Sequence, residues 1–494
     1  MRTSNYLSVT LVLVGCGTTG GEEMFATTSP GAAGEPASEV GGQASQGSDS
    51  SELGQPIQIA PGQAALTGVT SDGWAVFRDA DTLSAAKLGA EPSIQEITQQ
   101  PGSVLVRGKA VFNWANVDWM LGVGDLSVWT ADAGAHEIGP TPYAEGLVAA
   151  SEDGATIVYT VNTKKKTTDL LLTPSDLSAP QVLIPAMGLG SETTCAASIG
   201  FVGERLFVGW CQAGSRVAKL ERYELVGDAW EPTLIADDAL PVWSADSSGD
   251  RVFFQSSAYS AYFSENGKQV LIDAGVGQGL LLPDGSAALY TVGDQLRRSA
   301  MPDVNPVPIV TTGYKQPIEF SPAFDLALYS TTVTYDAGTQ RDLRLVSTDA
   351  FNPEPIELVA EPVATLGRSS MTQDGRFVFY LTDVTPSGGS LHIVAKDGTE
   401  QLVLPNVLEV AAANDSTLIF TDNSSDPALY PIVADLEIID VANETVPRLL
   451  EAKILDGRSF QLARERDTVF YVRSGVDRDA EAAERDGLFL LSIH

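Results

Sequence analysis

One short motif recurs along the chain and constrains its fold more than any other feature. In its clearest form, at Thr372–Asp383, an Asp-Gly turn leads into a strand rich in aromatic and aliphatic residues. Copies of this turn and strand recur about 34 to 52 residues apart, close to the spacing of one four-stranded propeller blade. They lie at Thr70–Phe77, Gly108–Phe112, Ser151–Tyr159, Gly203–Val208, Gly249–Phe254, Pro283–Tyr290, Asp325–Tyr329, Asn414–Phe420 and Arg466–Tyr471. The sequence therefore predicts an all-β chain, a β-propeller of about eight to ten antiparallel blades.

The ends of the folded region complement each other. The last unit stops after a third strand at Leu488–Ile493, and Ile57–Ile59 can supply the missing fourth strand. Pairing the two ends removes exposed strand edges, which otherwise promote aggregation. One ring of eight, one ring of ten and two smaller rings all fit the repeats, and the complementary ends favour one ring.

The Asp-Gly turn followed by an aliphatic and aromatic strand resembles the propeller repeats of the TolB family. The resemblance covers nearly the whole folded region but rests on short motifs, so it implies the fold and no particular ligand. The separate N-terminal domain of that family has no visible counterpart here. The Trp-Asp and Gly-His signatures of WD repeats are also missing.

The N-terminal residues resemble a bacterial lipoprotein signal peptide. Arg2 precedes the apolar run Leu7–Val14, which is too short to span a bilayer, and Leu13–Cys16 matches the lipobox. This resemblance implies that residues 1–15 are removed and that Cys16 carries the lipid. Because Gly17 rather than Asp follows the cysteine, it also implies the outer membrane of a Gram-negative bacterium, facing the periplasm or the cell surface.

The two remaining segments differ in composition. Residues 16–55 are acidic and contain few apolar residues, which predicts a disordered tether. Residues 56–494 are predicted to form the propeller domain.

The net charge is −34, from 64 acidic and 30 basic residues. Such a surface repels phosphate backbones and anionic membranes, so nucleic acid is excluded as a partner and membrane contact is assigned to the lipid alone. High solubility is the ordinary interpretation of this charge. The alternative is an acidic face that recruits cations or a basic partner.

Catalytic and metal-binding motifs are scarce. The three histidines, His136, His392 and His494, lie far apart, and no G-x-S-x-G or glycine-rich phosphate loop occurs. We therefore predict no catalytic residue, metal or cofactor. Acidic loops around Asp422 and Asp477 could offer oxygens to Ca²⁺, but neither matches an EF-hand loop, and solvated loop acids are the ordinary interpretation.

Long insertions fall between the second and third strands of the predicted blades, at Asn116–Gly124, Thr163–Thr168, Thr334–Gln340, Asp383–Gly389, Asp422–Tyr430 and Ser474–Arg485. In a propeller these loops share one face, and loops on a rigid scaffold commonly carry binding. The binding-face candidates lie in these insertions and include an aromatic anchor, a basic run and loop acids: Trp119, Met120, Lys164, Lys165, Asp422, Asp426 and Asp477.

Cys195 and Cys211 are predicted to form a disulfide, since an exported protein meets an oxidising compartment. A hairpin centred on Gly203 places the two cysteines opposite each other. A two-residue turn at Gly203 and Glu204 would instead place them on opposite faces and favour two free thiols.

Two functional hypotheses follow. The first is a non-catalytic binding or scaffold module for an envelope protein or polysaccharide. The alternative is a propeller enzyme, a glycan-acting hydrolase or lyase with carboxylates at the central channel. A purely structural surface protein is a third interpretation.

Lipidation gives the first testable prediction. Replacing Cys16 by Ala should release the protein from the membrane fraction, because no acyl chain would then anchor it. Fractionation of cells that express wild type or variant measures this. An unchanged membrane fraction for Cys16→Ala would show that the anchor is elsewhere.

Overall fold

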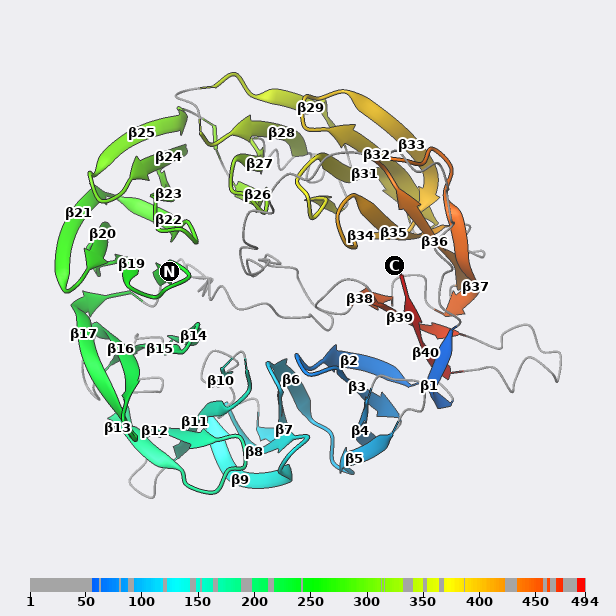
Figure 1. Ribbon diagram of the computed structural model, residues 1–494. Helices are drawn as coiled ribbons and strands as arrows, with labels where there is room; N and C mark the ends of the chain where they lie inside the picture. The colour runs from blue at the N-terminus through cyan, green and yellow to red at the C-terminus, as the bar shows by residue number, and fades with distance from the viewer. Residues whose placement is uncertain are drawn as a thin grey trace, which may run out of the picture. The chain divides into compact units, whose positions relative to one another are not determined.

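The computed structural model is a β-propeller of ten four-stranded antiparallel blades (Figure 1), and no helix occurs among the described residues. The structure describes residues 56–493 apart from 62–63, 80, 88–92, 119–121, 143–147, 152, 163–167, 188–197, 212–216, 241–242, 312, 315, 332–340, 350–352, 364–367, 386, 423–432, 456–459, 463–467 and 474–486. The predicted fold class is confirmed, and the number of blades lies at the upper end of the predicted range.

Six blades, numbered 1 to 6 in chain order, lie in the first part of the chain. Their strands are β2 (Ala65–Val69), β3 (Trp74–Asp79), β4 (Thr82–Lys87) and β5 (Ile94–Thr98); β6 (Ser103–Arg107), β7 (Ala110–Asp118), β8 (Val123–Thr130) and β9 (Gly134–Pro142); β10 (Ala149–Ala150), β11 (Thr156–Asn162), β12 (Thr168–Pro174) and β13 (Gln181–Met187); β14 (Ser198–Val202), β15 (Arg205–Cys211), β16 (Ala218–Val226) and β17 (Ala229–Ala239); β18 (Trp243–Ala245), β19 (Arg251–Gln255), β20 (Ser260–Glu265) and β21 (Lys268–Ala274); β22 (Val276–Leu281), β23 (Ala287–Val292), β24 (Gln295–Ala300) and β25 (Asn305–Val310).

Four further blades, numbered 7 to 10 in chain order, follow. They are β26 (Gln316–Phe320), β27 (Leu326–Ser330), β28 (Arg341–Ser347) and β29 (Ile356–Val363); β30 (Ser369–Met371), β31 (Phe377–Thr385), β32 (Gly388–Ala395) and β33 (Glu400–Val407); β34 (Glu409–Ala412), β35 (Thr417–Asp422), β36 (Val433–Asp440) and β37 (Arg448–Leu455); β38 (Gln461–Leu462), β39 (Thr468–Arg473) and β40 (Gly487–Ser492), with β1 (Ile57–Pro61).

The ten blades fall into two compact units. Blades 1 to 6 make up most of the first unit, Thr67–Lys315 with Ser347–Glu354. Blades 7 to 10 belong to the second unit, which also contains β1.

The predicted pairing of the two chain ends is confirmed within the second unit. β1 lies antiparallel to β40, with Ile57 opposite Leu490 and Gln58 opposite Phe489. Ile59 of this strand is 3% exposed. The N-terminal strand thus covers the edge that β40 would otherwise present to solvent.

Apolar side chains between successive blades form the core. One cluster joins blades 8 and 9 through Phe379, Leu391, Val410 and Phe420. Because both faces of a blade are covered in this way, the second strands are apolar at successive positions rather than at alternate ones.

In blades 6, 8 and 10, a tyrosine of the second strand also bonds to the outer strand of the preceding blade. The hydroxyl of Tyr290 donates to Asp273 of β21 at 3.3 Å. The hydroxyls of Tyr380 and Tyr471 donate to the Leu358 carbonyl and to Glu451. Burial raises the pKa of Tyr380 to about 12, so its hydroxyl remains a donor at physiological pH.

The β14–β15 hairpin corrects the register on which the disulfide argument rested. Val202 pairs with Arg205, so the turn contains two residues, Gly203 and Glu204, rather than being centred on Gly203. Gly203 has a φ of 57°, which suits the first central position of a two-residue hairpin turn. Cys211 is buried and disulfide-bonded. Cys195 lies outside the described residues, so its pairing stays a prediction.

The closing strand gives a stability prediction. Replacing Ile59 by Ser should lower the free energy of unfolding by roughly 2–4 kcal/mol, because it leaves a cavity and a buried hydroxyl beside β40. Urea unfolding followed by tryptophan fluorescence measures this. Gln58→Ser on the same strand, where the side chain is exposed, is the matched control and should change stability little. Equal stability of Ile59→Ser and wild type would contradict the closing role of β1.

Candidate functional site

Each blade has two ends with different connections. The first and second strands, and the third and fourth, are joined at what we call the turn end. The second and third strands, and successive blades, are joined at what we call the loop end. The sequence predicts the loop end as the binding face, so the two ends are compared below.

The turn end contains the recurring motif, and its hydroxyl residue organises the turn. Ser151 donates to Asp153 at 2.6 Å and accepts the Thr156 N–H at 2.9 Å. Thr70, Ser321 and Thr372 make the same two kinds of contact in their own blades. The hydrogen bond from Ser151, together with one from the Ala155 N–H, lowers the pKa of Asp153 below its usual value.

Turns of neighbouring blades are bonded directly to one another. The Ser247 N–H donates to the Pro283 carbonyl at 2.7 Å, and the Ser71 N–H donates to the Gly108 carbonyl at 2.9 Å. In the second unit, the Asp374 N–H donates to the Asp415 carbonyl at 3.3 Å. The motif therefore connects blades as well as shaping its own turn.

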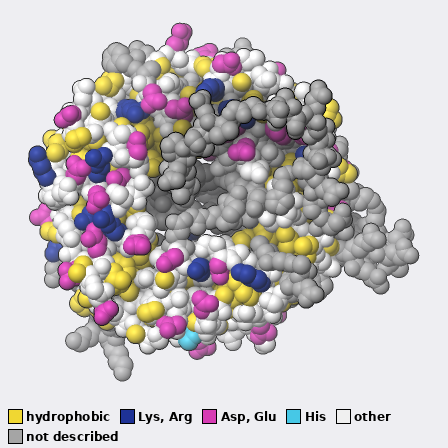
Figure 2. All heavy atoms as spheres, in the orientation of Figure 1, with side chains coloured by type: hydrophobic (Ala, Val, Ile, Leu, Met, Phe, Trp, Pro, Cys, Tyr) yellow, Lys and Arg dark blue, Asp and Glu magenta, His cyan; other side chains and the backbone are white. Residues whose placement is uncertain are grey.

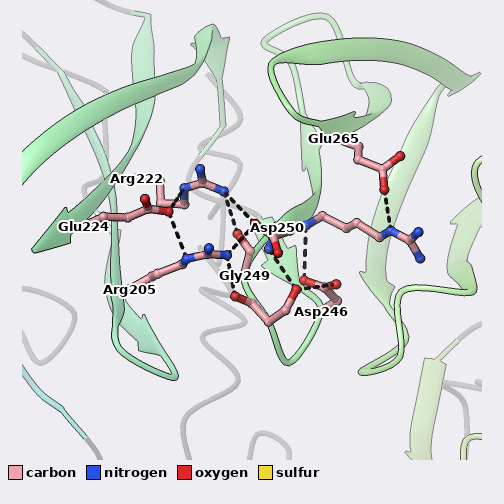
Figure 3. A network of polar contacts seen from close by, with 9 residues as sticks. Arg205, Arg222, Glu224, Asp246, Gly249, Asp250 and Glu265 are labelled. Atoms are coloured by element: carbon pink, nitrogen blue, oxygen red, sulfur yellow. Dashed lines mark hydrogen bonds and ion pairs between the residues drawn. The ribbon is translucent and has the colours of Figure 1, made fainter. Parts of the chain in front are cut away.

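Arginines reinforce the turn end between blades 4 and 5 (Figure 3). Arg205 forms ion pairs with Glu224 at 2.9 Å and with Asp250 at 2.7 Å. Arg222 bridges Glu224 at 3.0 Å and donates to the Gly249 carbonyl at 2.9 Å. The charges of this network are thus paired across the two blades.

Two arginines also pack over the turn glycine of the next blade. A Cβ atom at Gly249 would lie 2.9 Å from Cδ of Arg205, and one at Gly285 would lie 2.6 Å from Cδ of Arg251. Both glycines have φ near 70°, at 71° and 68°. Glycine is required here for the backbone conformation and for the approach of the arginine stem. On the face shown in Figure 2, Lys and Arg side chains lie among Asp and Glu side chains in the region of β17 to β21.

Most of the predicted binding-face residues are not covered by the structure. Trp119, Met120, Lys164, Lys165, Asp426 and Asp477 lie outside the described residues. So do Cys16 and Cys195. Asp422 is described, ends β35 and pairs with Asp435 of β36. The structure therefore does not test whether these candidates come together.

Two of the predicted insertions are shorter than expected. In blade 2, β7 continues to Asp118 and β8 begins at Val123. In blade 8, β31 continues to Thr385 and β32 begins at Gly388. Asn116 and Asp383 lie within these strands at positive φ and mark irregular pairing. Much of each predicted loop is thus a strand extension.

Four aspartates of the first unit, each in a different blade, lie at the loop end and accept hydrogen bonds from uncharged groups. Asp125 accepts from the Asn116 side-chain amide at 3.0 Å, and Asp169 accepts from the Ala186 N–H at 2.9 Å. Asp238 accepts from Ser257, and Asp294 accepts from the Gly313 N–H at 3.0 Å. Sequence reasoning did not identify these four residues, because an isolated strand-end Asp carries no distinctive motif. None of these hydrogen bonds brings a positive charge to the carboxylate. Other loop-end carboxylates are paired with arginines, Asp273 with Arg297 at 2.7 Å and Asp342 with Arg344 at 2.9 Å.

The first strands of the blades bear on the enzyme hypothesis, because in a propeller they surround the central channel. In the described residues of these strands, carboxylates occur only at Glu319 and Glu409. Glu319 accepts the Met371 N–H at 3.1 Å, and Glu409 forms an ion pair with Arg368 at 2.5 Å. Neither Glu319 nor Glu409 was singled out by the sequence.

His392 lies in β32 of blade 8, and both of its ring nitrogens contact neighbouring side chains. One nitrogen is 3.0 Å from the Thr382 hydroxyl, and the other is 3.2 Å from Glu400. The ring stacks on Tyr380 at a centroid distance of 5.0 Å. This placement fits a satisfied structural histidine.

Two features are absent from the described residues. No group of three or more His, Cys, Asp or Glu side chains there is arranged to hold a metal ion. None of the residues that the structure describes forms a helix with the length and apolar character that a bilayer span requires.

Comparison with known proteins yields similarities of structure only. No family model and no curated protein matches the sequence. Solved structures that match include a eukaryotic initiation factor (11% identity, TM-score 0.46, covering 70% of this chain and 88% of that one). An oligogalacturonate lyase in complex with manganese matches at 11% identity and a TM-score of 0.33, over 71% and 98% of the two chains. TolB from Acinetobacter baumannii matches at 13% identity and 0.26, over 57% and 76%. TolB is thus among the structural neighbours, and no activity is transferred from any of them.

The lowered pKa of Asp153 gives a pH prediction. The ionised carboxylate is favoured in the folded state, so its contribution is present above its ordinary pKa and is lost as pH falls through the lowered value. Asp153→Asn should cost roughly 1 kcal/mol at pH 7 and less at pH 3. Urea unfolding at the two pH values measures the difference, with Asp132→Asn as the control. An equal cost at both pH values would contradict the prediction.

Proposed function

We propose that this protein is a non-catalytic binding module of the bacterial cell envelope, anchored to the outer membrane through Cys16. The loop end of its blades would engage a protein partner with a basic surface. The observation that carries the proposal is the set of loop-end aspartates, among them Asp125, Asp169 and Asp294, whose hydrogen bonds come from uncharged groups.

At the turn end, acidic side chains are matched by arginines or held within the turns themselves. The pairs of Arg205 with Asp250 and of Arg251 with Glu265 are examples. At the loop end, Asp125, Asp169 and Asp294 accept from uncharged groups. Negative potential at one end favours encounter with a basic surface and discriminates against acidic ones.

The solved structures of similar fold include a lyase as well as TolB, so the enzyme alternative stays open. A hydrolase or lyase of glycans needs two cooperating carboxylates. Glu319 and Glu409 are already engaged, by a backbone N–H and by Arg368. This engagement supports a binding role over a catalytic one. Product formation from envelope polysaccharide by wild type, lost in Glu409→Gln, would overturn the proposal.

The binding proposal is tested by charge neutralisation at one end. The variant Asp125→Asn with Asp169→Asn keeps the side-chain shapes and hydrogen-bond acceptors but removes two charges. Affinity capture from detergent-solubilised envelopes should recover the partner at least threefold less than with wild type. Added salt should weaken capture by wild type, because it screens exposed charges.

A matched variant removes two charges from exposed turn-end positions, Asp132→Asn with Asp303→Asn. Capture by this control should equal that of wild type. Equal loss in both double variants would show that net charge rather than the loop end decides binding. Unchanged capture by the loop-end variant would place the binding surface elsewhere.

A further inference from the structure

The hairpin of β16 and β17 in blade 4 extends beyond its own sheet. β15 begins to pair with β16 at Leu206, opposite Tyr223. Beyond that point, Leu225 pairs with Trp230 and Val226 with Ala229, and these pairs belong to the hairpin alone. In blade 5 the equivalent hairpin ends level with the second strand, because Glu265 pairs with both Arg251 and Lys268. Blade 4 therefore carries a projecting tip at its turn end.

The projecting tip is apolar where a hairpin tip in water is usually polar. Leu225 and Val226 are 58% and 53% exposed, and Leu234 farther along β17 is 52% exposed. Trp230, opposite Leu225, packs its ring edge-on against Phe201 at a centroid distance of 6.3 Å. The tip thus presents exposed aliphatic side chains, Leu225 on the face of Trp230 and Val226 on the other face, and exposed apolar side chains with a polar rim are typical of interaction sites.

The outer edge of this hairpin is poorly suited to pairing with another strand. β17 is the last strand of its sheet. Pro232 lies within it and offers no backbone N–H. Proline on an edge strand is a common protection against edge-to-edge association. Recognition at this hairpin is therefore expected to use side chains rather than an added strand.

Acidic side chains surround the apolar tip. Glu204, Asp228 and Glu231 are exposed around it. The nearby arginines, Arg205 and Arg222, are committed to Glu224 and to blade 5. The rim of the tip is therefore negatively charged.

One acidic side chain on the tip lies beside a pair that is already satisfied. Glu231 lies directly opposite Glu224 across the hairpin, and Glu224 forms ion pairs with Arg205 and Arg222. Glu231 is exposed and is the carboxylate of this pair that faces a partner.

We infer that this tip docks a basic polypeptide segment that carries an apolar anchor. The segment would cover the end of the hairpin, with apolar groups against Leu225 on one face and Val226 on the other, and flanking Lys or Arg side chains would meet Glu204, Asp228 and Glu231. A second copy of this chain would bring two acidic rims together, and an anionic membrane would be repelled in the same way. This surface lies at the turn end and is distinct from the loop-end surface proposed above.

The test uses a fluorescein-labelled peptide of sequence Lys-Lys-Leu-Trp-Leu-Lys-Lys and the full-length protein. Fluorescence anisotropy should show saturable binding that weakens at least tenfold in the variant Leu225→Ser with Val226→Ser. Both positions are exposed, so the variant should keep the wild-type melting temperature. Peptides with Glu in place of Lys, or Ser in place of the apolar centre, should bind at least tenfold more weakly.

Leu271→Ser is the matched control, since Leu271 is 53% exposed on the outer strand β21 of blade 5. It should leave peptide binding unchanged, and so should Asp125→Asn with Asp169→Asn. Equal binding by wild type and the tip variant, or equal binding of the acidic peptide, would overturn the inference. A dimer of wild type that the tip variant loses in analytical ultracentrifugation would assign the tip to a second copy and also overturn it.

Discussion

The contact on which the architecture depends is made by a single hydroxyl in the first turn of a blade. The side chain of Ser151 or Thr372 accepts a backbone N–H across the turn and donates to the following Asp. These hydrogen bonds satisfy polar backbone and side-chain groups in the turn, where the bonding between strands has ended. A turn fixed in this way can offer its own backbone to the next blade. The hydrogen bonds from Ser71 to Gly108 and from Asp374 to Asp415 show this use of the turn.

The remaining contacts between blades follow from that alignment. When turns are in register, the second strand of one blade lies against the outer strand of the preceding one, and tyrosine hydroxyls such as that of Tyr290 reach it. Arginine stems then cover the turn glycines, as Arg251 covers Gly285. These links occur at both rims of an apolar interface. These directional bonds fix how far one blade is displaced along its strands relative to the next. Apolar packing cannot do this, because it is not directional.

The two ends of the blades also carry different surface groups. At the turn end, Arg205 and Glu224 are bonded within the protein. At the loop end, Asp273 is paired with Arg297, whereas Asp125 and Asp169 are held by neutral donors. The β16–β17 tip is an exception at the turn end, because Leu225 and Val226 are exposed there beyond the sheet. Two surfaces of different chemistry thus arise on one scaffold.

The sequence determined the repeating blade, its Asp-Gly turn and the complementary ends. These depend on local turn chemistry and on strand composition, and both are written in consecutive residues such as Thr372–Asp383. It also placed β1 beside β40, because a unit with three strands needs a fourth. It could not determine the hairpin register at Gly203, since a three-residue turn centred on Gly203 and a two-residue turn at Gly203 and Glu204 both fit the same residues. Nor could it show that Asp125 and Asp169 face one end while Arg205 spans two blades. Those facts depend on strand length and on which residues meet across neighbouring sheets, and only the tertiary structure brings such residues together.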